Sequence, residues 1–135
     1  MACLDTTILI DLARKKSQRR QAAFRKIEEL TKAGQGLATT RFNVAELYVG
    51  ISRSSHPQQD EKAIHQLLSV LEILEFDDAA THVFAFITAF LQRIGKPAGD
   101  MDVLIAATAM VHGHALITRN AKHFKHIPHL QVEEY

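Results

Sequence analysis

Short apolar runs alternate along the chain with longer segments in which apolar residues recur every three or four positions. The short runs are typical of buried strands, and the longer segments are typical of helices with one apolar face. This pattern predicts strands at residues 2–4, 37–39, 73–76, 115–118 and, more weakly, 130–133. It predicts helices over residues 7–16, 17–32, 41–52, 57 to about 71, 78–94 and 101–112.

Residues with known helix-end preferences support several of these boundaries. Thr6 can cap the first helix, and Pro57 fits the first turn of the fourth helix. Gly34 and Gly95 follow two helical segments and are expected to end them. The connections between elements are therefore short, and we expect residues 1–135 to form one domain.

Strands that alternate with helices predict an α/β fold, with a central parallel sheet of four to five strands and helices on both faces. The segment 101–112 is apolar on almost all sides, so we expect it to be a buried central helix. In the helix 41–52, Phe42, Ala45 and Val49 are in register and are expected to form its buried face. In a sheet of this kind, functional groups gather at the carboxyl ends of the strands.

Oxygen-bearing side chains from four separate elements are expected at that edge of the sheet. Asp5 ends the first strand, Asn120 follows the fourth, and Glu46 lies about one turn into the helix after the second. Asp100 and Asp102 stand at the start of the buried helix. Carboxylates that lie close together cannot all stay ionised without a cation, and Mg²⁺ prefers such ligands. The residues alone also allow a simpler interpretation, in which these side chains cap helices, form a turn or face solvent.

Four segments of the chain resemble the motifs of the PIN-domain family, in the same order and over essentially the whole chain. They are residues 4–12, 40–47, 99–109 and 116–124, and the third resemblance is the strongest. The first motif alone is weak, but four together are highly specific. The chain is most similar to VapC-type toxins of bacterial toxin–antitoxin pairs.

This resemblance implies a Mg²⁺- or Mn²⁺-dependent endoribonuclease on a PIN fold, a three-layer sandwich around the parallel sheet. By position, it implies a catalytic and metal-binding core of Asp5, Glu46 and Asp102. Asn120 occupies the fourth catalytic position, and Asp100 is an additional candidate metal ligand. The candidate supporting residues are two hydroxyls near the metal and two arginines placed to contact the scissile phosphate, namely Thr6, Thr118, Arg41 and Arg119.

The resemblance also implies partners. We expect a homodimer, an RNA substrate such as a tRNA or rRNA loop, and a cognate antitoxin whose peptide covers the active site. Toxin–antitoxin hetero-oligomers of this kind would contact DNA only through the antitoxin.

Two other functions remain open at this point. A non-catalytic nucleic-acid-binding or regulatory PIN protein would need a damaged acidic set, whereas this chain keeps Asp5, Glu46 and Asp102. A phosphatase or other doubly wound hydrolase would turn over small phosphate esters, but the sequence has nothing that resembles a Gly-rich phosphate-binding loop.

The charge of the chain is nearly balanced but unevenly distributed. Its formal net charge is +1, which excludes a polybasic tail. Residues 1–56 hold ten basic and five acidic side chains, whereas residues 57–135 hold six basic and ten acidic ones. Much of the basic excess is one stretch, made of Arg14, Lys15, Lys16, Arg19, Arg20, Arg25, Lys26 and Lys32. This stretch is either a solvated helical face or a contact for an RNA backbone.

For two further groups of residues, the sequence allows a functional role but favours a structural one. Five histidines lie near the C-terminus, at His112, His114, His123, His126 and His129. Zinc binding by them is conceivable, but without cysteines a surface or core-edge location is favoured. Phe84, Phe86, Phe90 and Ile94 indicate core or a dimer interface more than base stacking.

Compartment is indicated by three features. The lone Cys3 cannot form an internal disulfide, and its position favours a buried apolar residue in the first strand. The N-terminus lacks the basic region of a signal peptide, and no apolar run is long enough to span a membrane. We therefore expect a cytoplasmic protein with no membrane contact.

Overall fold

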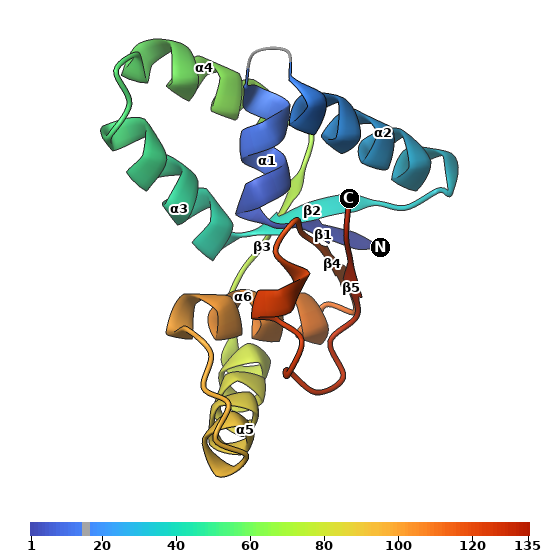
Figure 1. The fold of residues 1–135 in the computed structure, drawn as a ribbon, viewed down its shortest axis with the longest axis vertical. Coiled ribbons are helices and arrows are strands. Elements are labelled where there is room, and N and C mark those ends of the chain that lie inside the picture. Colours follow the sequence, from blue (N-terminus) through green and yellow to red (C-terminus); the bar gives the residue numbers. More distant parts are fainter. Residues whose placement is uncertain (15–16) are drawn as a thin grey trace.

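The computed structural model describes residues 1–14 and 17–135, and its elements follow the predicted alternation of strands and helices (Figure 1). The strands are β1 Ala2–Leu4, β2 Leu37–Thr40, β3 Glu72–Leu74, β4 Ala115–Ile117 and β5 Val132–Glu133. The helices are α1 Thr6–Ala13, α2 Gln18–Lys32, α3 Arg41–Ser52, α4 Pro57–Leu68, α5 Asp78–Arg93 and α6 Asp100–Val111, with a short 3₁₀ helix, η1, at Ala121–His123.

The strands form one five-stranded parallel sheet in the order β3-β2-β1-β4-β5, which confirms the predicted α/β class. β1 lies at the centre, where Cys3 pairs with Ala38 of β2 on one side and with Leu116 of β4 on the other. Burial on both sides of the sheet raises the pKa of the Cys3 thiol to about 12, so this cysteine is a core residue as predicted.

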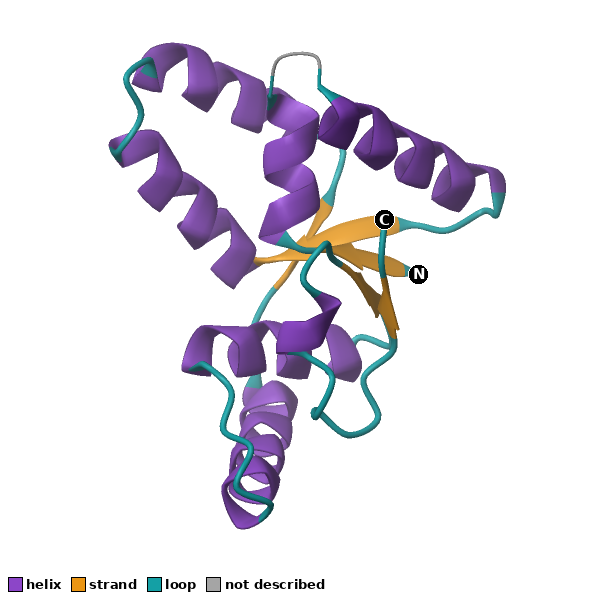
Figure 2. Ribbon diagram, in the orientation of Figure 1, coloured by secondary structure: helices purple, strands orange, loops and turns teal. Residues whose placement is uncertain are grey.

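Helices cover both faces of the sheet and make a three-layer sandwich. Helices α1 to α4 lie on one side, and α5 and α6 lie on the other (Figure 2). Successive residues of a strand point to opposite faces, so Leu4 packs with Ile8 and Leu9 of α1, whereas Cys3 packs with the helices α5 and α6. The two cores therefore meet at the central strand, and its carboxyl end is fixed from both sides.

Several predicted boundaries are confirmed and others are wrong. Gly34 and Gly95 have φ angles of 75° and 67° just after α2 and α5, and Pro57 is the first residue of α4. Thr6 does not cap α1, because the helix begins at Thr6 and Asp5 holds the N-cap position. The third strand lies at Glu72–Leu74 instead of 73–76, and the helix before it ends at Leu68. The predicted end of the first helix at residue 16 lies outside the described residues.

The buried faces of α3 and α6 differ in how well the apolar pattern predicted them. α6 is buried from Ile105 to Ala109, as expected for a central helix. In α3, the predicted face is right for Phe42, which packs against the core, and wrong for Ala45, which is exposed, and for Val49, which is 52% exposed. Its buried residues are Asn43, Val44 and Leu47. The helix is turned so that a polar amide faces inward, and a pattern that counts only apolar residues cannot find such a face.

No helix in residues 1–14 and 17–135 is long and apolar enough to cross a membrane.

Candidate active site

Asp5 is the best-fixed carboxylate at the edge of the sheet. It follows β1, and only 6% of it is exposed. Its Oδ1 accepts a hydrogen bond from Nδ2 of Asn43 at 2.9 Å, and its Oδ2 accepts one from Oγ1 of Thr118 at 2.7 Å. These bonds come from α3 and from the residue after β4, so three elements converge on one carboxylate. They also explain why Asp5 makes no side-chain cap for α1.

Asn43 is held in place by the start of its own helix. Its backbone N–H donates to Oγ1 of Thr40 at 3.2 Å, and its Oδ1 accepts from the backbone N–H and the hydroxyl of Thr40 at 3.2 and 2.7 Å. This reciprocal cap leaves the Nδ2 group to bond Asp5. We did not predict a role for Asn43 from the sequence, although Thr40-x-x-Asn43 has the spacing of a capping box.

Thr6 links Glu46 to the same cluster. Its hydroxyl donates to Oε1 of Glu46 at 2.6 Å and accepts from Nδ2 of Asn43 at 2.9 Å. Glu46 is half-buried on α3, where it stands one turn beyond Asn43. The structure therefore brings Thr6, Glu46 and Asp5 together through Asn43, an arrangement that suits the supporting role expected for Thr6.

The carboxylates of the site disfavour one another's ionised form. Partial burial raises the pKa of Glu46, and the charges of Asp5 and Asp102 raise it further, against the opposing bond from Thr6. Burial and the charge of Asp5 also raise the pKa of Asp102, against the effect of His123, whose Nδ1 is 3.9 Å from Oδ2 of Asp102. Asp5, Glu46 and Asp102 thus form one electrostatic cluster, which a cation would stabilise.

The segment after β4 reaches the site through backbone and side-chain bonds. Besides bonding Asp5, Oγ1 of Thr118 accepts from the backbone N–H of Asn120 at 3.0 Å. Asn120 precedes η1, is partly buried and makes no side-chain cap for that helix. The structure therefore places Thr118 inside the cluster and Asn120 beside it.

Both arginines expected to contact phosphate are held by carboxylates elsewhere. The guanidinium of Arg119 donates twice to Asp11, at 2.9 and 2.7 Å, and Asp11 is fully buried. Arg41 pairs with Glu75, with both side chains exposed, and its Nε lies 3.0 Å from Oε1 of Glu75. Each arginine therefore has an intramolecular partner, and its contact with a phosphate stays a prediction.

The buried Asp11 has a second partner, the partly buried Tyr135, and sequence reasoning predicted neither residue. The hydroxyl of Tyr135 donates to Oδ2 of Asp11 at 2.7 Å, and burial together with this carboxylate raises the pKa of Tyr135. The backbone N–H of Arg119 also donates to Oγ1 of Thr7 at 3.1 Å. These bonds tie the segment before Asn120 to α1. The sequence did offer a sign of this role, because Asp11 lies on the buried face of α1, where the other residues are apolar.

Asp100 stays apart from the acidic cluster. It is the exposed first residue of α6, and residues two positions apart on a helix point in different directions. Asp100 lines a small cavity of about 140 Å³ together with Thr88 and Pro97, whereas Asp102 lines a different one. The expectation that Asp100 supplies an additional metal ligand gains no support from this position.

The cluster is not closed into a finished metal site. Within the described part of the chain, no group of three or more His, Cys, Asp or Glu side chains is close enough to hold a metal ion. Among the C-terminal histidines, His112 lies beside His114, whereas His123 and His126 line one cavity. His114 is buried and its Nδ1 lies 2.7 Å from the carbonyl oxygen of His112, whereas His123 faces Asp102.

Within the described residues, the basic stretch does not form one uniform charged face, and Lys15 and Lys16 lie outside these residues. Lys26 is buried and its Nζ lies 2.9 Å from Oε1 of Glu133, and Lys32 pairs with Glu28 at 3.1 Å. The guanidinium of Arg20 lies 4.7 Å from the centre of the Phe24 ring. These contacts show that part of the stretch stabilises the fold.

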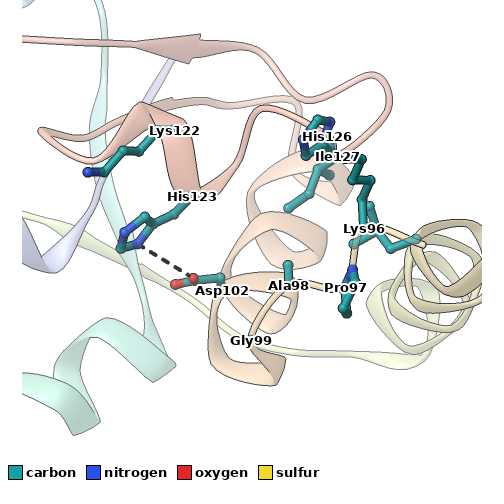
Figure 3. A pocket seen from close by; sticks show the side chains of 10 residues that line it. Lys96, Pro97, Ala98, Gly99, Asp102, Lys122, His123, His126 and Ile127 are labelled. Carbon is teal, nitrogen blue, oxygen red and sulfur yellow. Dashed lines mark ion pairs between the residues drawn. The ribbon is translucent and has the colours of Figure 1, made fainter. Parts of the chain in front are cut away.

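Two cavities flank the acidic cluster. One, of about 330 Å³, opens beside Asp102 between η1 and the loop before α6 (Figure 3). The other, of about 530 Å³, is lined by Glu46 and by apolar residues of α1, α3 and α4, among them Ile10, Leu47 and Ile64. The carboxylates therefore stand between two concave surfaces.

Known proteins share both the sequence pattern and this fold. The PIN domain family model matches residues 2–130. Ribonuclease VapC2 of Rickettsia felis is 33% identical over 107 residues, which cover 79% of this chain and 80% of the relative. The tRNA(fMet)-specific endonuclease VapC of Salmonella typhimurium is 29% identical over 99 residues, covering 73% and 75%. The crystal structure of VapBC2 from Rickettsia felis, bound to a DNA fragment from its promoter, matches with a TM-score of 0.89 and 30% identity over 99% of this chain and 98% of that one. The chain therefore belongs to the PIN-domain family, among its VapC-type ribonuclease toxins.

Proposed function

We propose that this chain is a metal-dependent endoribonuclease toxin in which Asp5, Glu46 and Asp102 bind Mg²⁺ or Mn²⁺. The observation that carries the proposal is the convergence of these carboxylates. Asn43 bonds both Asp5 and Thr6, and Thr6 bonds Glu46. Burial, together with the charges of Asp5 and Asp102, raises the pKa of Glu46. Such an arrangement costs stability, and it is typical of a site whose ionised form is completed by a bound cation.

The donor chemistry of the cluster fits a hard divalent cation. Its ligands are carboxylate oxygens, which Mg²⁺ and Mn²⁺ prefer, and Mg²⁺ in proteins keeps several of its waters. A small number of direct carboxylate contacts is therefore enough for such a cation. When bound, such a cation supplies a water nucleophile at neutral pH and neutralises charge on the phosphate.

The residues around the carboxylates have positioning roles. Asn43 and Thr118 hold the Asp5 carboxylate in one orientation, and Thr6 does the same for Glu46. We place Asn120 at the fourth catalytic position, where its amide oxygen is neutral and adds no repulsion to the cluster. Asp100 has at most an indirect role in this proposal, because it lines a different cavity.

We infer that the substrate is RNA with an accessible loop, such as a tRNA or an rRNA loop. The support is the relative named for cleavage of tRNA(fMet), together with the open cavity beside Asp102. A folded RNA in the cytoplasm is the substrate class that this combination favours.

We further propose that a cognate antitoxin of the VapB type neutralises the protein by covering this site. The cavity of about 530 Å³ begins at Glu46 and continues along the apolar side chains of α1, α3 and α4. An amphipathic segment of the antitoxin could lie there with its apolar side against Ile10 and Leu47. In such a complex, DNA would be contacted only through the antitoxin, as in a VapBC assembly.

A homodimer is part of the same proposal. Exposed apolar side chains on α5 and at the start of α6 offer a surface for a second copy, with Phe86 52% exposed and Met101 39% exposed. Light scattering on the purified protein would measure its oligomeric state, and a monomer at micromolar concentration would contradict this part.

The test of the enzyme assignment compares the wild type with Asp5→Asn and Asp102→Asn on a structured RNA with Mg²⁺. We expect each variant to lose at least about a hundredfold in cleavage rate, because a ligand of the activating cation is removed. Asp78→Asn, which changes an exposed acid at the start of α5, is the matched control and should cleave like the wild type. Equal cleavage by all four proteins, or undiminished cleavage in EDTA, would refute the assignment.

A further inference from the structure

The cavity beside Asp102 has a chemistry of its own. It lies between η1 and the loop that joins α5 to α6, and it has a volume of about 330 Å³. Its polar lining consists of Lys96, Lys122, His123, His126 and Asp102. Figure 3 shows Lys122 and His123 on η1 beside the Asp102 carboxylate, with Lys96 and Pro97 across the cavity.

The charge of this lining favours an anion. Lys96 and Lys122 bring two basic side chains to the cavity, whereas Asp102 is the one carboxylate among the lining residues. The Asp102 carboxylate already faces His123, at 3.9 Å. Away from that contact, the excess of lysine over carboxylate makes the cavity suitable for a phosphate group.

The start of α6 adds donors to the same cavity. Gly99 holds the N-cap position of this helix and lines the cavity, and a glycine has no side chain to cap the first turn. The N–H groups of a helix's first turn have no partners inside the helix and favour anions. Together with the two lysines, they form an environment for a phosphate within reach of Asp102.

The remaining wall of the cavity is apolar. Leu91, Pro97, Ala98 and Ile127 line it. Its volume is near the lower end of the roughly 300–1,000 Å³ typical of small-ligand sites. The apolar wall and Lys96 lie on one side of the cavity and Lys122 lies on the other, which suits one nucleotide with its sugar or base against the wall and a phosphate at each lysine.

We propose that this cavity binds one nucleotide of the RNA substrate next to the cleaved phosphodiester bond, with Lys96 and Lys122 each contacting one of the phosphates that flank this nucleotide. The inference rests on the proposed function, because Asp102 joins the cavity to the acidic cluster. It assigns the lysines to substrate binding and leaves the chemical step to the carboxylates.

The test measures RNA binding by Lys96→Ala, Lys122→Ala and the double variant. Each is made in the Asp5→Asn background, so that the probe, a fluorescein-labelled RNA hairpin with a single-stranded loop, stays intact in Mg²⁺. Lys125→Ala is the matched control. This lysine is exposed just after η1, three positions from Lys122, and does not line the cavity. Fluorescence anisotropy gives Kd at several KCl concentrations, and thermal unfolding checks that every variant is folded.

We expect each cavity lysine to contribute one phosphate contact. Its loss should lower the slope of log K against log salt by about 0.7, the value for one contact to a single strand. The ratio of variant to wild-type Kd should then shrink by roughly threefold between about 50 and about 200 mM KCl. The Lys125→Ala protein should keep the original slope and Kd.

Cleavage kinetics in the background with Asp5 intact separate binding from chemistry. The lysine variants should raise KM several-fold with little change in kcat. If the wild type cleaves RNA and both lysine variants match Lys125→Ala in Kd, salt slope and KM, the inference is overturned and the proposed function stands. If the wild type binds RNA through both lysines but cuts none, the nucleotide site stands and the proposed function falls.

Discussion

Replacing Arg119 with methionine tests the buried ion pair that ties the end of β4 to α1. Asp11 has no exposed surface, and it accepts two bonds from Arg119 and one from Tyr135. Methionine keeps much of the apolar length of arginine but removes the charge. The substitution therefore leaves a buried carboxylate with a single neutral donor.

The size of the effect follows from that burial. Removing one partner of a buried ion pair costs about 3–5 kcal/mol of the free energy of unfolding, because the other charge is left uncompensated. The Arg119 side chain is 30% exposed and Tyr135 keeps its bond to Asp11, so we expect the lower end, about 3 kcal/mol. At about 4 °C per kcal/mol, the melting temperature should fall by about 12 °C.

Urea denaturation followed by circular dichroism measures this loss, since the chain has no tryptophan for fluorescence. Arg41→Met is the matched control, because its pair with Glu75 has side chains 54% and 60% exposed, and solvent screening leaves such a pair little effect on stability. The double variant Asp11→Leu/Arg119→Met removes both charges and should recover most of the loss. A loss below about 1 kcal/mol for Arg119→Met, or a double variant no more stable than it, would refute the reasoning.

Three more predictions follow from the same structure. Asn43→Ala should cost about 2 kcal/mol in urea denaturation and slow RNA cleavage, because it removes both the cap of α3 and a donor to Asp5; wild-type stability would contradict the capping geometry. Leu47→Ala should lower the free energy of unfolding by about 2–4 kcal/mol, because Leu47 is buried, whereas Val49→Ala should lower it by less than about 0.5 kcal/mol. A larger loss for Val49→Ala than for Leu47→Ala would show that Val49 is on the buried face of α3, as the sequence predicted. Glu46→Gln should raise the melting temperature of the metal-free protein at pH 7, since a raised pKa means that ionised Glu46 destabilises the fold; this gain should vanish below the ordinary glutamate pKa of 4.5, and a gain that persists there would have another cause.

The sequence by itself determined the class of the fold and the family. Alternating strand and helix patterns require a parallel sheet covered on both faces, and glycines at positive φ, such as Gly34 and Gly95, end helices through purely local backbone freedom. The four motifs placed Asp5, Glu46 and Asp102 at one edge, because the carboxyl ends of parallel strands face the same way.

Only the tertiary structure decided which partner each side chain takes. The rotation of α3 depends on a bond from Asn43 to Asp5, a residue 38 positions away, and such a bond leaves no apolar period in the sequence. Arg119 lies within the fourth motif of the sequence. Its partner in the fold is Asp11 of α1, 108 positions away in the chain. The cavity that unites Lys96 with Lys122 likewise exists only once α6 and η1 are packed. Local preferences set where elements begin and end, whereas charges and polar groups are satisfied by whatever the folded chain brings within hydrogen-bond distance.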